Sequence, residues 1–274
     1  MLKLFRGGTA VVTLAFAGGL IVGGSAETRA APVTACTALN ICYCINSDNK
    51  AAIDANIVRI RQMLADERGR GKSIGYMSIP LSPAGGGYFP VNRDIAQQTK
   101  DNIEKRFGAQ SVWMLNPGAA GNLPAGASGA DFMYMWTTVL EGPRGMGDDF
   151  DFFYFVGPKD FGRFFALTGE GDMTKIEGYF DNRAASDPDF KKAVDQGALT
   201  KSGFRNYYAL KASVSFSYGS HDEWNIARLL NDRRRGAAEF GIANQLPMLF
   251  DGQAVNPGSY EAPTASGDVG RCIN

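Results

Sequence analysis

The chain has 274 residues, of which 45% are hydrophobic and 20% are charged, a composition typical of folded globular proteins that excludes a disordered chain. Its 28 basic residues balance its 28 acidic residues. No basic excess is therefore present to neutralise phosphates, and we expect no nucleic acid partner.

The first 30 residues have the three-part layout of a secretory signal peptide. Lys3 and Arg6 give a positive start, residues 9–22 are apolar or small, and cleavage points follow Ala26 and Ala30. The apolar run is shorter than the roughly 20 residues that span a membrane, so an uncleaved anchor is the weaker alternative. We predict an exported protein, either periplasmic or secreted.

Removal of the signal peptide changes little else in the chain. Loss of Lys3 and Arg6 lowers the basic count from 28 to 26, and the net charge becomes −2. No polybasic or amphipathic segment remains, so we expect no association with membranes. An alternative is a lipoprotein, because residues 33–36 (VTAC) resemble a lipobox.

Four cysteines remain in the mature chain, and in an oxidising compartment they predict disulfides with three possible pairings: Cys36, Cys42, Cys44 and Cys272. We expect Cys272 to join the N-terminal segment and the other two to pair. Cys42 and Cys44 are too close in sequence to pair without a strained ring. A zinc site would need further ligands, and no histidine accompanies these cysteines, so we expect no metal and no cofactor.

Hydrophobic periodicity predicts helices and strands that alternate along the chain. Helices are expected at 47–66, 92–107, 129–141 and 220–235, and strands at 74–79, 111–116, 150–156, 212–217 and 245–250. The weaker pattern around 160–210 indicates an inserted helical region. The alternation predicts a single α/β domain over 31–274. We expect a three-layer sandwich with a mainly parallel, roughly five-stranded flavodoxin-like or Rossmann-like sheet.

Ligands of such folds bind beyond the carboxyl ends of the strands. Ser78 lies at the end of the first predicted strand, 74–79, and the glycine run 85–87 follows it as either a flexible lid or an inert loop. Arg93, in the next helix, either faces an anionic group or is a solvated surface residue. The acidic run 148–151 can hold a hard cation or can be the solvated approach to a buried strand.

The densest polar cluster is residues 219–224, GSHDEW, which contains the only histidine. Ser220 and Glu223 have the spacing of a capping box, which explains both residues without any chemistry. Alternatively, a carboxylate in the first turn is ionised by the helix dipole, so Glu223 can act as a nucleophile or base. His221 is the second catalytic candidate, because histidine titrates near neutral pH.

Two segments resemble the nucleoside 2-deoxyribosyltransferases. Residues 76–81 (YMSIPL) are similar to the first-strand motif Tyr-Leu-Ala-Gly-Pro-Leu, and residues 219–227 (GSHDEWNIA) to the helix start G-T-x-x-E-x-x-x-A. The resemblance implies that Glu223 is the nucleophile that takes the sugar from the base, with Tyr76 and Pro80 at the pocket floor. The chain departs from the family at Ser217, where an aspartate is usual, in about fifty additional residues before that helix, and in its export.

These observations lead to two hypotheses about function. The first is an exported enzyme that cleaves N-glycosides or transfers glycosyl groups, with Glu223 and His221 as catalytic candidates. Its substrate-binding candidates are Tyr76, Ser78, Arg93 and Ser220. The alternative is a non-catalytic periplasmic or secreted protein that binds a small molecule or a partner. The enzyme hypothesis requires Tyr76, Ser78, Arg93 and Glu223 around one cleft.

Overall fold

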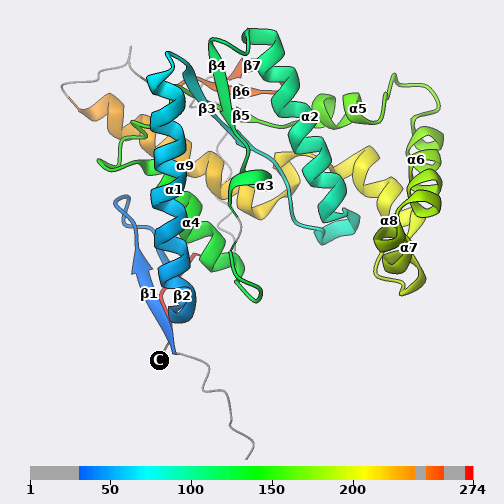
Figure 1. Ribbon diagram of the computed structural model, residues 1–274, viewed down its shortest axis with the longest axis horizontal. Helices are drawn as coiled ribbons and strands as arrows, with labels where there is room; N and C mark the ends of the chain where they lie inside the picture. Colours follow the sequence, from blue (N-terminus) through cyan, green and yellow to red (C-terminus); the bar gives the residue numbers. More distant parts are fainter. Residues whose placement is uncertain (1–30, 122, 238–244, 256–268, 274) are drawn as a thin grey trace, which may run out of the picture.

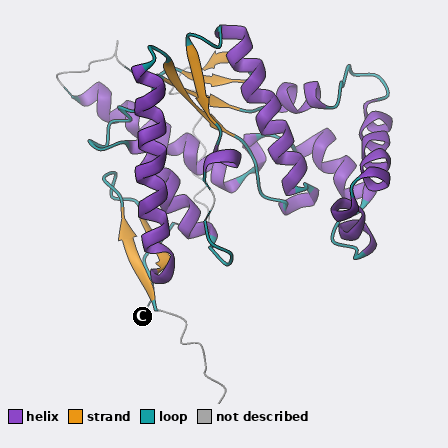
Figure 2. Ribbon diagram, viewed as in Figure 1, coloured by secondary structure: helices purple, strands orange, loops and turns teal. Residues whose placement is uncertain are grey.

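The computed structural model describes residues 31–121, 123–237, 245–255 and 269–273. It has the predicted α/β fold, with a five-stranded sheet flanked by helices on both faces (Figures 1 and 2). The strand order is β4-β3-β5-β6-β7, and every neighbouring pair is parallel except β6 and β7. The predicted signal peptide lies outside the described residues.

Most predicted strands occur within two or three residues of their expected bounds. The sheet strands are β3 (Ser73–Ser78), β4 (Val112–Leu115), β5 (Phe152–Phe155), β6 (Met248–Phe250) and β7 (Gln253–Val255). The predicted strand at 212–217 was wrong, because these residues form the 3-10 helix η4 (Val214–Phe216). Two causes are visible: β3 and β6 occupy both edges of β5, and Ser213 accepts a hydrogen bond from the Ser215 amide in a local turn.

Helices cover the two faces of the sheet in two separate cores. One face packs against α1 (Lys50–Gly69), α4 (Gly129–Glu141) and α9 (Tyr218–Gly236). The other packs against α2 (Phe89–Phe107), α5 (Pro158–Phe164), α6 (Asp172–Ser186), α7 (Pro188–Asp195), α8 (Lys201–Asn206) and the π-helix η3 (Tyr207–Lys211). Helices α6 to α8 gather to one side of the sheet (Figure 1). Among the described residues, no helix is long and apolar enough to cross a membrane.

Strand β3 divides its side chains between these two cores. Ile74 and Tyr76 belong to the core of α1, α4 and α9, whereas Met77 belongs to the core of α2. Because side chains alternate along a strand, Ser78 lies on the same face as Tyr76. This alternation directs the last two polar side chains of β3 toward α9.

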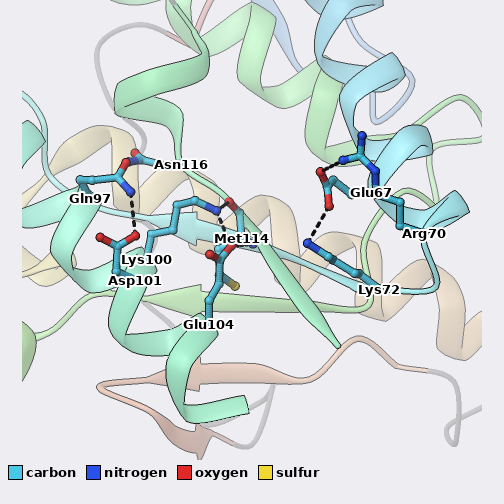
Figure 3. A network of polar contacts seen from close by, with 9 residues as sticks. All are labelled: Glu67, Arg70, Lys72, Gln97, Lys100, Asp101, Glu104, Met114 and Asn116. Carbon is cyan, nitrogen blue, oxygen red and sulfur yellow. Dashed lines mark hydrogen bonds and ion pairs between the residues drawn. The ribbon is translucent and has the colours of Figure 1, made fainter. Parts of the chain in front are cut away.

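The free edge of strand β4 is covered by side chains of α2 (Figure 3). The Met114 amide donates to Glu104 Oε1 at 2.9 Å, and Lys100 Nζ donates to the Met114 carbonyl at 2.8 Å. Lys100 and Glu104 also form an ion pair with each other. Edge strands expose unpaired backbone groups that invite aggregation, and this pair of side chains satisfies both backbone groups of Met114.

An N-terminal hairpin, which the periodicity analysis did not predict, lies apart from the main sheet. Strands β1 (Pro32–Cys36) and β2 (Cys42–Asn46) pair antiparallel, and the Tyr43 hydroxyl lies 2.7 Å from the Thr137 hydroxyl of α4. The expected disulfide arrangement is confirmed, with bonds Cys36–Cys42 and Cys44–Cys272. Because the Cys36 sulfur is bonded to Cys42, the structure contradicts the lipoprotein alternative.

Candidate functional site

A cavity of about 1200 Å³ opens at the carboxyl ends of β3 and β4 and reaches the start of α9. Three stretches of chain surround it: the loop after β3, the segment from the short helix α3 (Pro117–Ala120) into α4, and the segment from η3 to α9. Its walls are mostly apolar and aromatic, and include Phe89, Phe132, Met133, Trp136, Tyr207, Phe216 and Tyr218. The location agrees with the usual ligand position in α/β sheets.

Glu223 is the carboxylate of this cavity. Its side chain lines the cavity yet is only 8% exposed. Tyr76 Oη donates a hydrogen bond to Glu223 Oε1 at 2.5 Å, and Ser78 Oγ donates to Oε2 at 2.5 Å. Tyr76 and Ser78 are fully buried behind the carboxylate, so they fix its orientation without lining the cavity themselves.

The start of α9 explains why Glu223 points inward. The helix begins at Tyr218, and the Ser217 side chain caps it by accepting from the Ser220 amide. The predicted capping box of Ser220 and Glu223 was therefore wrong. Glu223 lies in the second turn, on the buried face of α9, and its carboxylate bonds to β3 instead of to the helix amides.

Burial dominates the electrostatics of Glu223. The pKa of Glu223 is raised from 4.5 to about 7, mainly by loss of solvation, with a smaller contribution from the nearby charge of Asp222. The hydrogen bonds from Ser78 and Tyr76 oppose this shift because they stabilise the ionised form. Burial and the Glu223 charge hold the Tyr76 pKa well above its usual value, so Tyr76 remains a hydrogen-bond donor. The carboxyl group therefore titrates near neutral pH, well above the range of an ordinary glutamate.

An aromatic wall adjoins this carboxylate. The Trp136 ring lies 5.9 Å from the Tyr76 ring, centroid to centroid, and also lines the cavity. Gly121 packs directly on Trp136, because a Cβ atom there would lie 2.1 Å from Trp136 Cζ2. A glycine at this position lets the backbone approach the indole more closely than any other residue would allow.

The glycine run 85–87 is packed, in contrast to the flexible lid considered from sequence. A Cβ on Gly86 would lie 2.5 Å from the Gly203 carbonyl oxygen, and one on Gly87 would lie 2.8 Å from the Tyr207 ring. Gly85 and Tyr207 both line the cavity. The glycines therefore permit close approach of η3 and α8, and η3 contributes Tyr207 and Lys211 to the cavity wall.

The structure brings together four of the six predicted site residues: Tyr76, Ser78, Ser220 and Glu223. His221 faces a second, smaller cavity of about 180 Å³ beside Trp224 and Phe250, with its Nε2 atom 2.7 Å from the Ser215 carbonyl oxygen. Arg93 is exposed, and its guanidinium lies 5.9 Å from the Phe89 ring centroid. These two residues are absent from the lining of the larger cavity in the described part of the chain. The expectation that Arg93 shares one cleft with Tyr76, Ser78 and Glu223 was therefore wrong for Arg93.

Several lining residues were not singled out from the sequence. Trp136 and Phe132 lie in a strongly apolar helix, where aromatic residues are ordinarily core residues. Lys211 lies at the end of η3, in a segment without clear periodicity. No sequence signal separates these residues from ordinary core and surface positions.

The acidic run after α4 is engaged in ion pairs with arginines. Asp148 pairs with Arg144 at 2.7 Å, and Asp151 pairs with Arg68 at 3.1 Å. Asp149 Oδ2 lies 3.8 Å from Arg61 Nε. Within the described residues, no cluster of three or more acidic, histidine or cysteine side chains is arranged to hold a metal ion.

A comparison of the chain with protein-family models, with curated proteins and with solved structures finds no match. Function is therefore argued from the geometry of the site alone.

Proposed function

We propose that the protein is an exported enzyme that cleaves N-glycosides or transfers glycosyl groups, with Glu223 as the nucleophile. The observation that carries the proposal is the orientation of the Glu223 carboxylate by Tyr76 and Ser78 at a large cavity. Positioning by two neutral donors leaves a lone pair on each oxygen for a substrate carbon. Export is supported by the two disulfides, which persist in oxidising compartments.

The geometry suits a two-step substitution. A Glu223 oxygen bonds to the anomeric carbon of the sugar while the bond from that carbon to the base nitrogen breaks. Water or an acceptor hydroxyl then attacks the same carbon and releases the carboxylate. Two inversions at one carbon return the sugar to its original configuration. The apolar walls exclude water from the first step, which strengthens the interactions with the reacting charges.

The test is release of free base from a panel of nucleosides by the oxidised mature protein, followed by chromatography. Glu223→Gln preserves the shape and the hydrogen-bonding capacity of the side chain but removes the nucleophile, so we expect activity to fall by about 1000-fold or more. Glu141→Gln is a matched control, because Glu141 is also buried, accepts two hydrogen bonds and lies outside the cavity lining. A Glu223→Gln variant that retains full activity excludes the proposal.

A second candidate function is non-catalytic binding of a small apolar ligand. The mostly apolar walls of the cavity favour it, because binding sites are lined mainly by hydrophobic and aromatic side chains. A ligand that raises the melting temperature of both the wild type and Glu223→Gln, without turnover by either, supports binding over catalysis.

A further inference from the structure

The charges on the cavity wall are few. Among the described residues that line it, only Glu223 and Lys211 carry a charge. Lys211 is exposed at the end of η3, and no described carboxylate forms an ion pair with it. The cavity therefore has one buried anionic group at its floor and one solvent-exposed cation.

No second acidic side chain lines the described part of the cavity beside Glu223, and this restricts the leaving group. A neutral purine or pyrimidine base departs easily only when an acid protonates it, a contribution of about 100-fold to 10,000-fold in rate. No other carboxyl group, histidine or cysteine lines the described part of the cavity. Burial raises the pKa of Tyr207 to about 12, which makes that phenol a poor acid. Glu223 cannot supply the proton, because it must be ionised to attack.

A base that already carries a positive charge removes this requirement. When the bond to such a base breaks, its electron pair cancels the charge on the ring nitrogen, and the base leaves neutral. The floor of the cavity is also suited to a flat cation. The carboxylate attracts it, and Trp136, which lines the cavity beside Tyr76, is an aromatic side chain of the kind that makes cation–π contacts.

Lys211 indicates a second feature of the ligand. Because no described carboxylate pairs with Lys211, its ammonium group can pair with an anionic group of the ligand. Hydroxyl groups of Ser82, Ser217 and Tyr218 line the same cavity and can add hydrogen bonds to it. At 1200 Å³ the cavity has room for a base, a sugar and a phosphate together.

We propose that the substrate is a phosphorylated N-glycoside of a cationic, pyridinium-type base, whose phosphate group binds Lys211. This inference rests on the proposed function of Glu223. A Glu223 oxygen bonds to the anomeric carbon as the bond to the ring nitrogen breaks, and neutral pyridine base leaves. Water then attacks the anomeric carbon, the ester bond to Glu223 returns its electron pair to the carboxylate, and one proton passes to solvent.

The test compares four probes that vary base charge and phosphate independently: nicotinamide mononucleotide, nicotinamide riboside, AMP and adenosine. Base release is measured for the wild type, Glu223→Gln, Lys211→Met and a control, Lys192→Met. Lys192 is an exposed lysine of α7 that does not line the cavity. Melting temperatures of all variants show that each is folded.

We expect the wild type to cleave nicotinamide mononucleotide at least about 100-fold faster than AMP in kcat/KM. Loss of the phosphate should raise KM by about threefold to tenfold, and Lys211→Met should abolish that difference while Lys192→Met preserves it. Equal rates for AMP and nicotinamide mononucleotide, or a phosphate preference that survives Lys211→Met, overturn the inference. If adenosine or AMP is cleaved and neither nicotinamide probe is, and the cleavage is lost in Glu223→Gln, the inference about the substrate is overturned but the proposed function is preserved. No base release from any probe overturns both.

Discussion

The raised pKa of Glu223 predicts that the protein loses stability as the pH rises through neutrality. The carboxyl group titrates at about 7 in the folded protein and near its ordinary value of 4.5 when unfolded. The folded state therefore holds this proton more tightly. The resulting stabilisation is fully present below about pH 4.5 and disappears as the pH passes 7. Glu223→Gln removes this dependence, because the amide does not titrate.

The magnitude follows from the size of the shift. About 2.5 pKa units correspond to about 3 kcal/mol at 1.36 kcal/mol per unit, and most of this lies between pH 5 and pH 9. Glu223 is buried, so little solvent screening reduces it. For a domain of this size, we expect the melting temperature of the wild type to fall by roughly 5–10 °C more than that of Glu223→Gln over this range.

Thermal and denaturant unfolding of both proteins at pH 5 and pH 9 measures the effect. Other groups also titrate in this range, including Asp160, whose pKa burial raises to about 6. They are the same in both proteins, so the difference between the two isolates Glu223. If the free energies of unfolding of the wild type and Glu223→Gln change with pH by the same amount, within about 0.5 kcal/mol, then burial does not raise the pKa of this carboxyl group as inferred.

Further predictions concern catalysis and the walls of the site. If Glu223 is the nucleophile, kcat/KM should rise with pH through an apparent pKa of about 7, and a pH-independent rate would contradict that role. Ser78→Ala removes a hydrogen-bond donor that lowers the Glu223 pKa, so the apparent pKa of the kcat/KM profile should rise by about one unit. An unchanged apparent pKa would show that this hydrogen bond does not influence the ionisation of Glu223. Gly121→Ala should displace Trp136, reduce stability by about 1–3 kcal/mol and change the tryptophan fluorescence, whereas unchanged emission would contradict the packing. Replacing Cys44 and Cys272 by alanine should cost about 5 kcal/mol in denaturant unfolding, because their bond spans 228 residues; a cost below 1 kcal/mol would contradict the loop-entropy model.

The fold class was predictable because long amphipathic segments dominate the chain. Ile53, Ile57, Ile60 and Leu64 of α1 are all buried, as their spacing indicates. The strand predicted at 212–217 failed for a reason that periodicity does not contain. The sequence alternates small and apolar residues, but in the structure Val214 is buried and Phe216, which a strand would place on the same face, is exposed; β3 and β6 already occupy both edges of β5. Strand pairing depends on which segments reach the sheet, and that is a property of the whole chain.

The candidate site was predictable only where local geometry fixes the direction of a side chain. Residues two apart on a strand share a face, so Tyr76 and Ser78 act together, and the neighbouring residues of α9 set the inward direction of Glu223. His221, two residues before Glu223, turns to a different cavity because positions two apart on a helix do not share a face. Arg93 illustrates the remaining difficulty. Helix α2 begins at Phe89, three residues before the predicted start, so Arg93 lies in the second turn, where it is exposed and outside the cavity lining.

The same geometry explains why the role of Glu223 changed from helix cap to buried carboxylate. Sequence places Ser220 and Glu223 at capping-box spacing, but Ser217, three residues earlier, is also a capping residue, and the helix begins there. Starting the helix one turn earlier moves Glu223 into the second turn, where the helix amides already have partners. The carboxylate must then find donors elsewhere, and Tyr76 and Ser78 are the donors that β3 supplies. A buried carboxyl group held in this way, at the expense of a raised pKa, is more readily explained by chemistry at the cavity than by the stability of α9.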